Sequence, residues 1–521
     1  MRIYLLALML CLVALARPGL ADYSLTILHT NDVHGRFEPV GARDGACSEK
    51  ENFDRRCLGG TARLYTAIQS ARRSVENSVL VDSGDQFEGS MLFREHRGQL
   101  AAEMMNTLGY DAMTLGNHEF GSGAETLRAF IDKVFFPVLA ANVDVSGEPS
   151  LAGQVPRSVA LPIGGQQIGF IGIVPANTSE LTNIGSTLSF SAPDSAIRIE
   201  VARLSARGID KIVLLSHAGY TEDLRLAADI AGIDVIVGGH SHTFLHNDDV
   251  KATGPYPTMV GQTAVVQAYA FGRYLGRLDV IFDDTGQILE AKGEPIELDS
   301  QVTENLFVKS RIKEAAEPLK TLRNQVIGTA DAAIGEGLLG CRIAECPLGN
   351  LAAEAMLASA AQAGVEVAVT NSGSIKALIE PGEITLDDVI TAFPFQDTLT
   401  TFTVTGRALK DALEAGVSKV EVSSGRFPQI AGMRFSYRPL APKGTRITRV
   451  EIGGDALDPD REYTVVSNSF LRAGGDGYAL FREADGAETV GPEFADVLAD
   501  YLRANQPYMP FTDGRIEMVI D

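Results

Sequence analysis

Short apolar runs alternate with amphipathic segments through the first part of the chain. The apolar runs cover residues 25–28, 79–81, 112–115, 168–174, 212–215 and 235–237, and their length and composition predict buried β-strands. Between them, residues 61–72 and 99–108 carry apolar positions at helical spacing. This alternation, which continues to about residue 298, predicts an α/β fold.

A charged amphipathic segment, residues 303–323, follows this region. Leu306, Val308, Ile312 and Ala316 recur at helical spacing, which predicts a single helix joining two domains; a surface helix of the first domain is the alternative. A second α/β pattern then has a helix at residues 348–363 and strands at 365–369, 399–404, 433–437, 447–452 and 463–467. We therefore expect domains at residues 22–300 and 326–521, joined by a linker helix at 301–325.

The first 21 residues have the pattern of a signal peptide. Arg2 precedes the apolar residues 3–16, and Gly19 and Ala21 supply small side chains at a cleavage point. A transmembrane anchor needs about 20 apolar residues, so a retained anchor is the weaker alternative, and the C-terminal residues form no hydrophobic tail. We expect a secreted or periplasmic protein without a membrane anchor.

Composition narrows the classes of partner. The chain has 521 residues, 45% hydrophobic and 21% charged, which is typical of a globular protein with more than one domain. The formal net charge of -22 disfavours nucleic acid and anionic lipid as partners, because both carry negative charge. A site for an anionic substrate must therefore create its own positive field.

The cysteines beyond the expected signal peptide form two local pairs, Cys47 with Cys57 and Cys341 with Cys346. Export favours oxidation, so two disulfides with short loops are expected. A cysteine-based metal site is the weaker alternative, because no CxxC spacing occurs.

Metal-ligating residue types follow the predicted strands. Five of the eight histidines lie at strand ends, together with two aspartates and one asparagine: Asp32, His34, Asp85, Asn117, His118, His217, His240 and His242. Any one of them alone is more often a satisfied polar residue, but ligands of open α/β sheets gather at the carboxyl ends of strands. Carboxylate, imidazole and amide groups suit divalent Zn, Mn, Fe or Co. A pair of such ions about 3.5–4 Å apart catalyses phosphoryl transfer.

These strings resemble a known family. Asp32-Val33-His34, Gly84-Asp85, Gly116-Asn117-His118-Glu119 and Gly239-His240-Ser241-His242 are similar to the signature of calcineurin-like metallophosphoesterases. The longer strings at residues 28–35 and 116–120 resemble the 5'-nucleotidases. The resemblance implies a four-layer metallophosphoesterase β-sandwich flanked by helices, followed by a linker helix and an α/β substrate-binding domain.

The resemblance also implies an activity. We expect hydrolysis of nucleoside 5'-monophosphates, with nucleotide sugars and nucleoside di- and triphosphates as further candidate substrates. A 2',3'-cyclic nucleotide phosphodiesterase, or a bifunctional enzyme, is the first alternative. A nucleotide-binding protein with weak catalysis is the second.

The resemblance assigns the ligands of two divalent ions, Zn, Mn or Co. Asp32, His34, Asp85 and His242 would hold one ion, and Asp85, as a bridge, would share the other with Asn117, His217 and His240. His242 stands where the nucleotidases usually have Gln or Asn. Asp82 is a nearby rival to Asp85, ranked lower because Asp85 holds the Gly-Asp position.

His118 matches the family residue that faces the phosphate and stabilises charge in the transition state. The family orients this histidine with an Asp three positions later, where this chain has Gly121. We expect either that another acidic group takes the place of that Asp or that kcat is reduced.

The second domain would bind the base and the ribose of the nucleotide. By the resemblance, Phe395 and Phe470 stack the base, while Arg342, Asn371 and Asp476 hold ribose and phosphate. Taken singly, each Phe is more often a core residue. Lys376 stands where the family commonly has Arg, so it keeps the charge and loses the bidentate geometry.

Overall fold

The computed structural model describes residues 22–41, 47, 49–181, 187–335, 337–395 and 397–520. The predicted signal peptide at residues 1–21 lies outside the described residues. Within those ranges, none of the helices combines the length and the apolar character that crossing a membrane requires.

Two six-stranded sheets form the N-terminal unit. The first has the order β14-β13-β1-β2-β3-β4 and the second β11-β12-β10-β9-β7-β6. Their bounds are β1 (Tyr23–Thr30), β2 (Ser78–Asp82), β3 (Ala112–Thr114), β4 (Val138–Leu139), β6 (Ser158–Ile163), β7 (Gln166–Ile173), β9 (Ile212–Ser216), β10 (Val235–Gly238), β11 (Thr258–Val260), β12 (Thr263–Val266), β13 (Tyr274–Phe282) and β14 (Ile288–Glu297). Strands β1 to β4 run parallel, as do β7, β9, β10 and β12.

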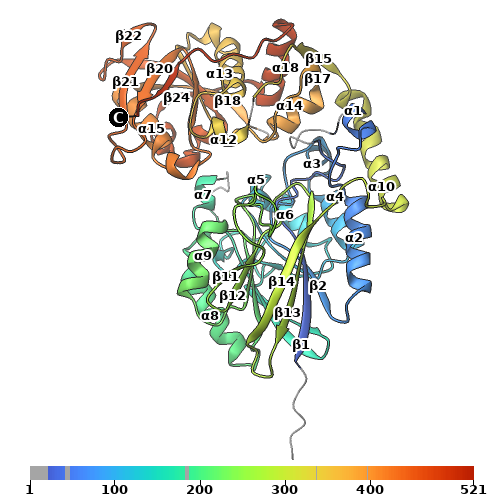
Figure 1. Cartoon of the computed structure of the whole chain (residues 1–521). Coiled ribbons are helices and arrows are strands. Elements are labelled where there is room, and N and C mark those ends of the chain that lie inside the picture. Colours follow the sequence, from blue (N-terminus) through green and yellow to red (C-terminus); the bar gives the residue numbers. More distant parts are fainter. Residues whose placement is uncertain are drawn as a thin grey trace, which may run out of the picture.

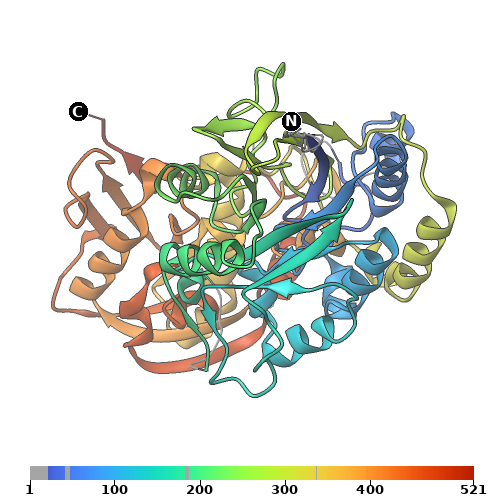
Figure 2. The same cartoon turned by 90° about the horizontal axis from the view of Figure 1, so that it is seen from below.

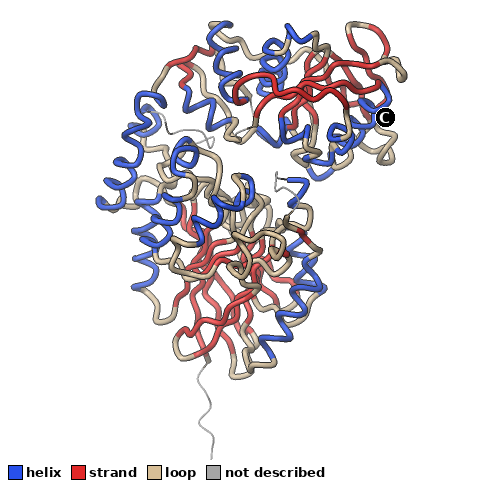
Figure 3. The backbone as a smooth tube through the Cα atoms, turned by 180° about the vertical axis from the view of Figure 1, so that it is seen from behind, coloured by secondary structure: helices blue, strands red, loops and turns tan. Residues whose placement is uncertain are grey.

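Apolar side chains between the two sheets form the inner core of this unit. Ile27 and Val79 of the first sheet share one buried cluster with Phe170, Val213 and Val235 of the second. Because successive side chains of a strand alternate between faces, the opposite faces pack under helices. The result is a β-sandwich between helical layers (Figure 3), which confirms the predicted fold.

Helices cover both outer faces of the sandwich (Figures 1 and 2). On the first sheet these are α2 (Thr61–Arg73), α4 (Gln99–Leu108) and α6 (Ala124–Ile131). On the second they are α8 (Pro193–Ser205) and α9 (Tyr220–Asp229). Shorter elements in the connections are α1 (Glu49–Phe53), α3 (Met91–His96), α5 (His118–Gly121), α7 (Thr178–Leu181), β5 (Val143–Asp144) and β8 (Ser189–Phe190).

The C-terminal unit contains a five-stranded, a four-stranded and a two-stranded sheet. The strands are β15 (Val326–Ala330), β16 (Val367–Asn371), β17 (Gly382–Thr385), β18 (Thr398–Thr405), β19 (Pro428–Ala431), β20 (Met433–Tyr437), β21 (Ile447–Ile452), β22 (Asp455–Ala456), β23 (Glu462–Asn468), β24 (Asp485–Glu493) and β25 (Ile516–Met518). The helices are α12 (Leu338–Cys341), α13 (Pro347–Ser359), α14 (Leu386–Ala392), α15 (Gly406–Val417), α16 (Ser469–Arg472), α17 (Ala479–Arg482) and α18 (Phe494–Ala504). The helix expected at residues 348–363 ends at Ser359, and a 3-10 turn (Ala361–Ala363) follows.

The connection between the units is not the single helix that the pattern predicts. Helix α10 (Leu306–Ala316) ends in a 3-10 turn (Glu317–Leu319), and α11 (Lys320–Arg323) follows. Pro318 lies in this turn and cannot donate a backbone hydrogen bond, which explains the break. Helix α10 packs on α2 of the first unit, as the alternative expected, whereas α11 packs on α14 of the second.

Ion pairs join the two units beside this connection. The Arg323 guanidinium binds Glu38 of the N-terminal unit at 2.7 Å and Asp387 of the C-terminal unit at 2.9 Å. Arg94 of α3 pairs with Glu493 at 2.7 Å. Both predicted disulfides, Cys47–Cys57 and Cys341–Cys346, are present, so these cysteine predictions are confirmed.

Asp234 makes the stability of the N-terminal unit depend on pH. Its carboxylate accepts the Ile212 backbone N–H at 2.7 Å, and thereby links the beginnings of β9 and β10. Burial raises the pKa of Asp234 to about 7. Because the folded pKa lies above the unfolded one, this group's contribution to stability is complete below about pH 4 and is lost as pH rises through about 7.

We therefore expect Asp234→Asn to flatten the loss of stability between about pH 4 and 7, because Asn keeps the acceptor and has no charge to bury. The gain at about pH 8 should be of order 1 kcal/mol, or about 1–2 °C in Tm. Thermal unfolding of the parent and of Asp234→Asn, at about pH 4 and at about pH 8, measures this gain. Asp284→Asn, at the exposed turn between β13 and β14, is the matched control. An equally steep loss in Asp234→Asn would contradict the assignment.

Candidate metal centre

The metal-ligating side chains predicted from the sequence converge at the carboxyl ends of parallel strands from both sheets. Asp32 and His34 follow β1, Asp85 follows β2, Asn117 and His118 follow β3, His217 follows β9, and His240 and His242 follow β10. All are buried except His240 and His242, which are partly exposed. The tertiary structure thus brings all eight to one edge of the sandwich.

The backbone at this edge is strained. Asp32, His34, Asp85, His240 and His242 all have positive φ, between 49° and 71°. This left-handed region is costly for residues with a Cβ, so it persists where surrounding structure enforces it, which is typical of functional sites. Tight turns of this kind direct several side chains of a short loop toward one point.

Three groups of these side chains have ligand atoms within 4.8 Å of one another: Asp32, His34 and His242; Asp85, His217 and His240; and His34, Asp85 and His118. In the first, His242 Nε2 lies 3.2 Å from His34 Nε2 and 3.3 Å from Asp32 Oδ1. In the second, His217 Nε2 lies 2.9 Å from Asp85 Oδ2. His34 Nε2 approaches the same Asp85 oxygen at 3.9 Å, so Asp85 lies between the first two groups.

These residues fit divalent cations. The Nε2 atom of His217 is buried and makes no hydrogen bond in the described part of the chain, although Asp85 Oδ2 is close. Two imidazole nitrogens that face each other across 3.2 Å, as in His34 and His242, leave a gap that a shared cation suits. Mixed carboxylate and imidazole donors are the set that borderline divalent metals prefer.

Burial and neighbouring charges shift the pKa values of two histidines of the centre in opposite directions. Burial alone would lower the pKa of His217, but the carboxylates of Asp85 and Asp32 outweigh it and raise that pKa to about 10. Burial, with His217 nearby, lowers the pKa of His240 to about 3. Neighbouring histidines with opposite shifts are typical of a functional site.

His118 lies beside this centre with one ring nitrogen toward each of two carboxylates. Nδ1 lies 2.5 Å from Glu88 Oε2, and Nε2 lies 3.7 Å from Asp85 Oδ2. Glu88 therefore places a carboxylate against the His118 ring, a contact that Gly121 has no side chain to make. Burial opposes the charged form of His118, but Asp85 and Glu88 outweigh it and raise its pKa above the ordinary value.

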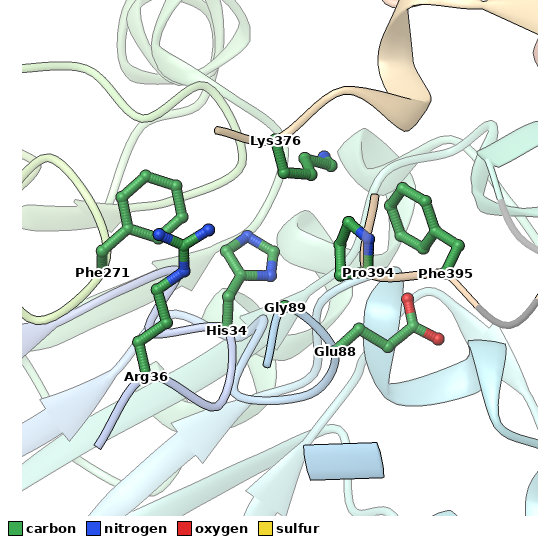
Figure 4. Close-up of a pocket in the computed structure, with 8 residues that line it drawn as sticks. All are labelled: His34, Arg36, Glu88, Gly89, Phe271, Lys376, Pro394 and Phe395. Carbon is green, nitrogen blue, oxygen red and sulfur yellow. The ribbon is translucent and has the colours of Figure 1, made fainter. Parts of the chain in front are cut away.

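The predicted substrate residues face the metal centre from the C-terminal unit. The Phe395 ring stacks on the His118 imidazole with centroids 5.3 Å apart and planes 9° apart, and Lys376 Nζ lies 5.3 Å from the centre of the same ring. Figure 4 shows Lys376 and Phe395 opposite His34 and Glu88 across a pocket. The structure thus brings the predicted base-stacking residue into contact with the predicted phosphate-facing one.

The remaining substrate residues interact with one another in the C-terminal unit. Asn371 Nδ2 donates to Asp476 Oδ2 at 2.7 Å, and Arg342 interacts electrostatically with Asp476. Asp397 accepts the Ser469 hydroxyl at 2.8 Å, which places the segment of Phe395 beside that of Phe470.

Comparison with known proteins agrees with this geometry. A family model described as calcineurin-like phosphoesterase matches residues 25–244, and one described as 5'-nucleotidase, C-terminal domain, matches residues 326–483. The 5'-nucleotidase of Homo sapiens is 33% identical, with 98% of this chain and 93% of that protein covered. This chain belongs to the 5'-nucleotidase family.

Two further relatives extend the comparison. A snake venom 5'-nucleotidase of Gloydius brevicauda is 33% identical over 95% of this chain and 89% of its own. The crystal structure of a 5'-nucleotidase precursor from Thermus thermophilus has a TM-score of 0.91 and 36% identity, and covers 96% of this chain and 100% of its own. The protein is accordingly a metal-dependent phosphoester hydrolase with the two-part architecture of its family.

In this member of the 5'-nucleotidase family, side-chain carboxylates hold the loops that carry the predicted metal ligands. The sequence motifs indicate these hydrogen bonds only in part. Glu119 accepts the backbone N–H groups of Asp85 at 3.0 Å, Gln86 at 2.7 Å and Gly116 at 2.6 Å. Asp82 accepts from Thr30, Gly84 and Gln86, so its carboxylate supports the loop, in agreement with its lower rank as a ligand. Glu119 lies inside the Gly-Asn-His-Glu string, which was the available signal.

Sequence reasoning missed several residues of the pocket in Figure 4, among them Glu88, Arg36 and Phe271. The Arg36 guanidinium lies 4.1 Å from the centre of the Phe271 ring, and Arg36 Nη2 donates to Thr391 O of the C-terminal unit at 3.4 Å. The two are distant in sequence, and neither belongs to a ligand motif. Arg36 adds a buried positive charge to the wall of this pocket in an otherwise acidic chain.

Gly116 tests the geometry of the centre. A Cβ built on Gly116 would lie 2.2 Å from Asp85 Oδ1 and 2.7 Å from Asp85 N, so Gly116→Ala should displace this carboxylate. We expect metal affinity and kcat/KM each to fall about 10- to 100-fold. Metal titration with phosphate release measures both. Gly337→Ala, where an added Cβ meets no atom within 4 Å among the described residues, is the control. Unchanged metal affinity in Gly116→Ala would exclude Asp85 as a ligand held by this contact.

Proposed function

We propose that this protein is an exported two-metal nucleotidase that hydrolyses nucleoside 5'-monophosphates to nucleoside and phosphate. The observation that carries the proposal is the contact of Phe395 with His118, because it joins a base-stacking surface to a phosphate-facing imidazole beside the metal centre. The relatives named 5'-nucleotidase, matched along nearly the whole chain, support the same substrate class.

Two divalent ions, Zn, Mn or Co, fit the ligand groups. Asp32, His34 and His242 would hold one, Asn117, His217 and His240 the other, and Asp85 would bridge them. When bound, such ions supply a nucleophile at neutral pH and positive charge for the phosphoryl group in transit.

The chain's own residues would then bind and orient the nucleotide. Lys376 and Arg342 give the C-terminal wall of the site a positive field. This field attracts the anionic substrate, which the chain's net charge of -22 would otherwise repel. Phe395 and Phe470 would stack the base, and Asn371 and Asp476, already hydrogen-bonded to each other, would hold the ribose hydroxyls. His118 would hold a proton at Nε2, facing the phosphate oxygens.

The same proposal includes the organisation of the chain. The family-model matches at residues 25–244 and 326–483, together with the break at Pro318, support domains at 22–300 and 326–521 with a linker at 301–325. The leader pattern at residues 1–21 and the two disulfides support a secreted or periplasmic location, because disulfides persist in oxidising compartments.

A substrate panel tests the activity. After chelation and reloading with Zn²⁺, Mn²⁺ or Co²⁺ in turn, we expect phosphate release from nucleoside 5'-monophosphates that depends on the metal and is about tenfold or more faster than from 2',3'-cyclic nucleotides. Nucleotide sugars and triphosphates measure the breadth of the site. Faster turnover of the cyclic nucleotides would favour the phosphodiesterase alternative, and binding of AMP without turnover with any metal would favour the binding protein.

The aromatic residues test the base-binding part of the proposal. Phe395→Ala and Phe470→Ala should each raise KM for AMP about 5- to 100-fold, because each base stack contributes about 1–3 kcal/mol. KM for ribose 5-phosphate, which has no base, should change far less. Phe135→Ala, at a side chain 90% exposed outside the site, is the matched control. Equal effects on the two substrates would show that these rings do not stack the base.

A further inference from the structure

His118 lacks the carboxylate that usually follows it one helical turn later. Helix α5 spans only His118–Gly121, and position 121 has no side chain. A buried imidazole that no group orients can rotate and exchange tautomers, and so loses efficiency as a partner for the phosphate. Something else must fix this ring if the site is to work at full rate.

Glu88 contacts the ring at the atom where such an orienting group is needed. Its Oε2 atom lies 2.5 Å from His118 Nδ1, and the two side chains are 14% and 9% exposed. A hydrogen bond here holds one proton between Nδ1 and the carboxylate, and it leaves Nε2, where the proposed function places the second proton of the charged ring, facing the metal centre. Glu88 belongs to none of the ligand groups of the centre in the described residues.

The backbone around Glu88 shows that this position is enforced. Glu88 has φ 60°, in the left-handed region, and Gly89 follows with φ 113°. A Cβ on Gly89 would lie 2.4 Å from His34 O, so the chain passes tightly against the His34 ligand loop. A charged residue with a long side chain is an unusual occupant of a left-handed turn, and such strain is typical of positions with a functional role.

Glu119 fixes the distance between the two partners. Its carboxylate accepts the N–H groups of Asp85, Gln86 and Phe87, in the loop that ends at Glu88. The same carboxylate accepts the Gly116 N–H, in the loop that carries His118. The contact between Glu88 and His118 therefore joins two segments that are already pinned together, and its entropic cost is small.

From this arrangement we propose that Glu88 is a positioning residue of the hydrolytic reaction: it orients His118 through Nδ1 and takes the role that the family gives to a carboxylate at position 121. The expected effect on turnover rests on the proposed function. The expected protonation and orientation of the His118 ring do not depend on it. The carboxylate has moved from the helical turn of His118 itself to a neighbouring loop. Its chemistry toward the ring is the same.

Kinetics with a relocated charge test the proposal. Glu88→Gln should lower kcat for AMP about 10- to 100-fold, as losses of orienting partners do, and leave KM within about threefold. The double variant Glu88→Gln with Gly121→Asp should regain about tenfold or more of the lost kcat, because a carboxylate again follows His118 by one turn. Glu88→Gln with Gly121→Asn, of equal size and no charge, should regain nothing. Glu95→Gln, an exposed glutamate of α3, is the control for the substitution itself.

A measurement without substrate separates this proposal from the proposed function. In protein labelled with ¹⁵N-histidine, the Nδ1 resonance of His118, assigned with His118→Ala, should show a protonated and strongly hydrogen-bonded nitrogen that Glu88→Gln loses. A kcat of Glu88→Gln within twofold of the parent, or no rescue by Gly121→Asp over Gly121→Asn, would overturn the proposal. So would an unchanged His118 spectrum, or loss of bound metal in Glu88→Gln. Lack of nucleotide turnover in the parent would instead refute the proposed function and leave the spectrum as the test of the contact.

Discussion

The buried carboxylate of Glu119 holds together the two loops on which the metal centre depends. It accepts backbone N–H groups from residues 85, 86 and 87 after β2 and from residue 116 after β3. A carboxylate that is buried without partners is costly, and several N–H donors offset this cost. The arrangement fixes Asp85, Asn117 and His118 relative to one another across two strands, and the strained backbone of the ligand loops can persist because such contacts over-determine it.

Charge is divided between the two units of the molecule. The N-terminal unit gathers carboxylates and imidazoles that suit cations, whereas the C-terminal unit supplies Lys376 and Arg342, which suit a phosphate. Burial, with Arg342 nearby, lowers the pKa of Lys376 to about 8. Bringing these groups face to face requires a contact between the units, and ion pairs such as Arg94 with Glu493 stabilise that contact. The acidic surface therefore does not prevent the site from attracting an anion.

Two of the positions at which this chain departs from its family, His242 and Gly121, lie around the same imidazoles. His242 stands in the first ligand group where an amide is usual, 3.3 Å from Asp32, and an imidazole there keeps ligation possible. Gly121 leaves a gap beside His118, and Glu88 reaches the ring from another loop. The first departure replaces one group able to bind a metal with another, whereas the second, under the proposal for Glu88, supplies the same carboxylate from a different residue. A comparison along one motif alone would therefore miss the carboxylate beside His118.

The sequence by itself determined the strands, the order of the two α/β units, the disulfide pairs and the ligand-type residues, because these depend on local periodicity and on short motifs. Even the break at Pro318 had a local signal, since proline cannot continue the hydrogen bonds of a helix. Only the tertiary structure decided which groups meet across the fold. Glu88 and His118 are separated by 30 positions, and Arg36 reaches Phe271 from another strand end. Such contacts depend on how loops of different strands turn and pack at one edge of the sandwich, and no periodicity along the chain encodes that geometry.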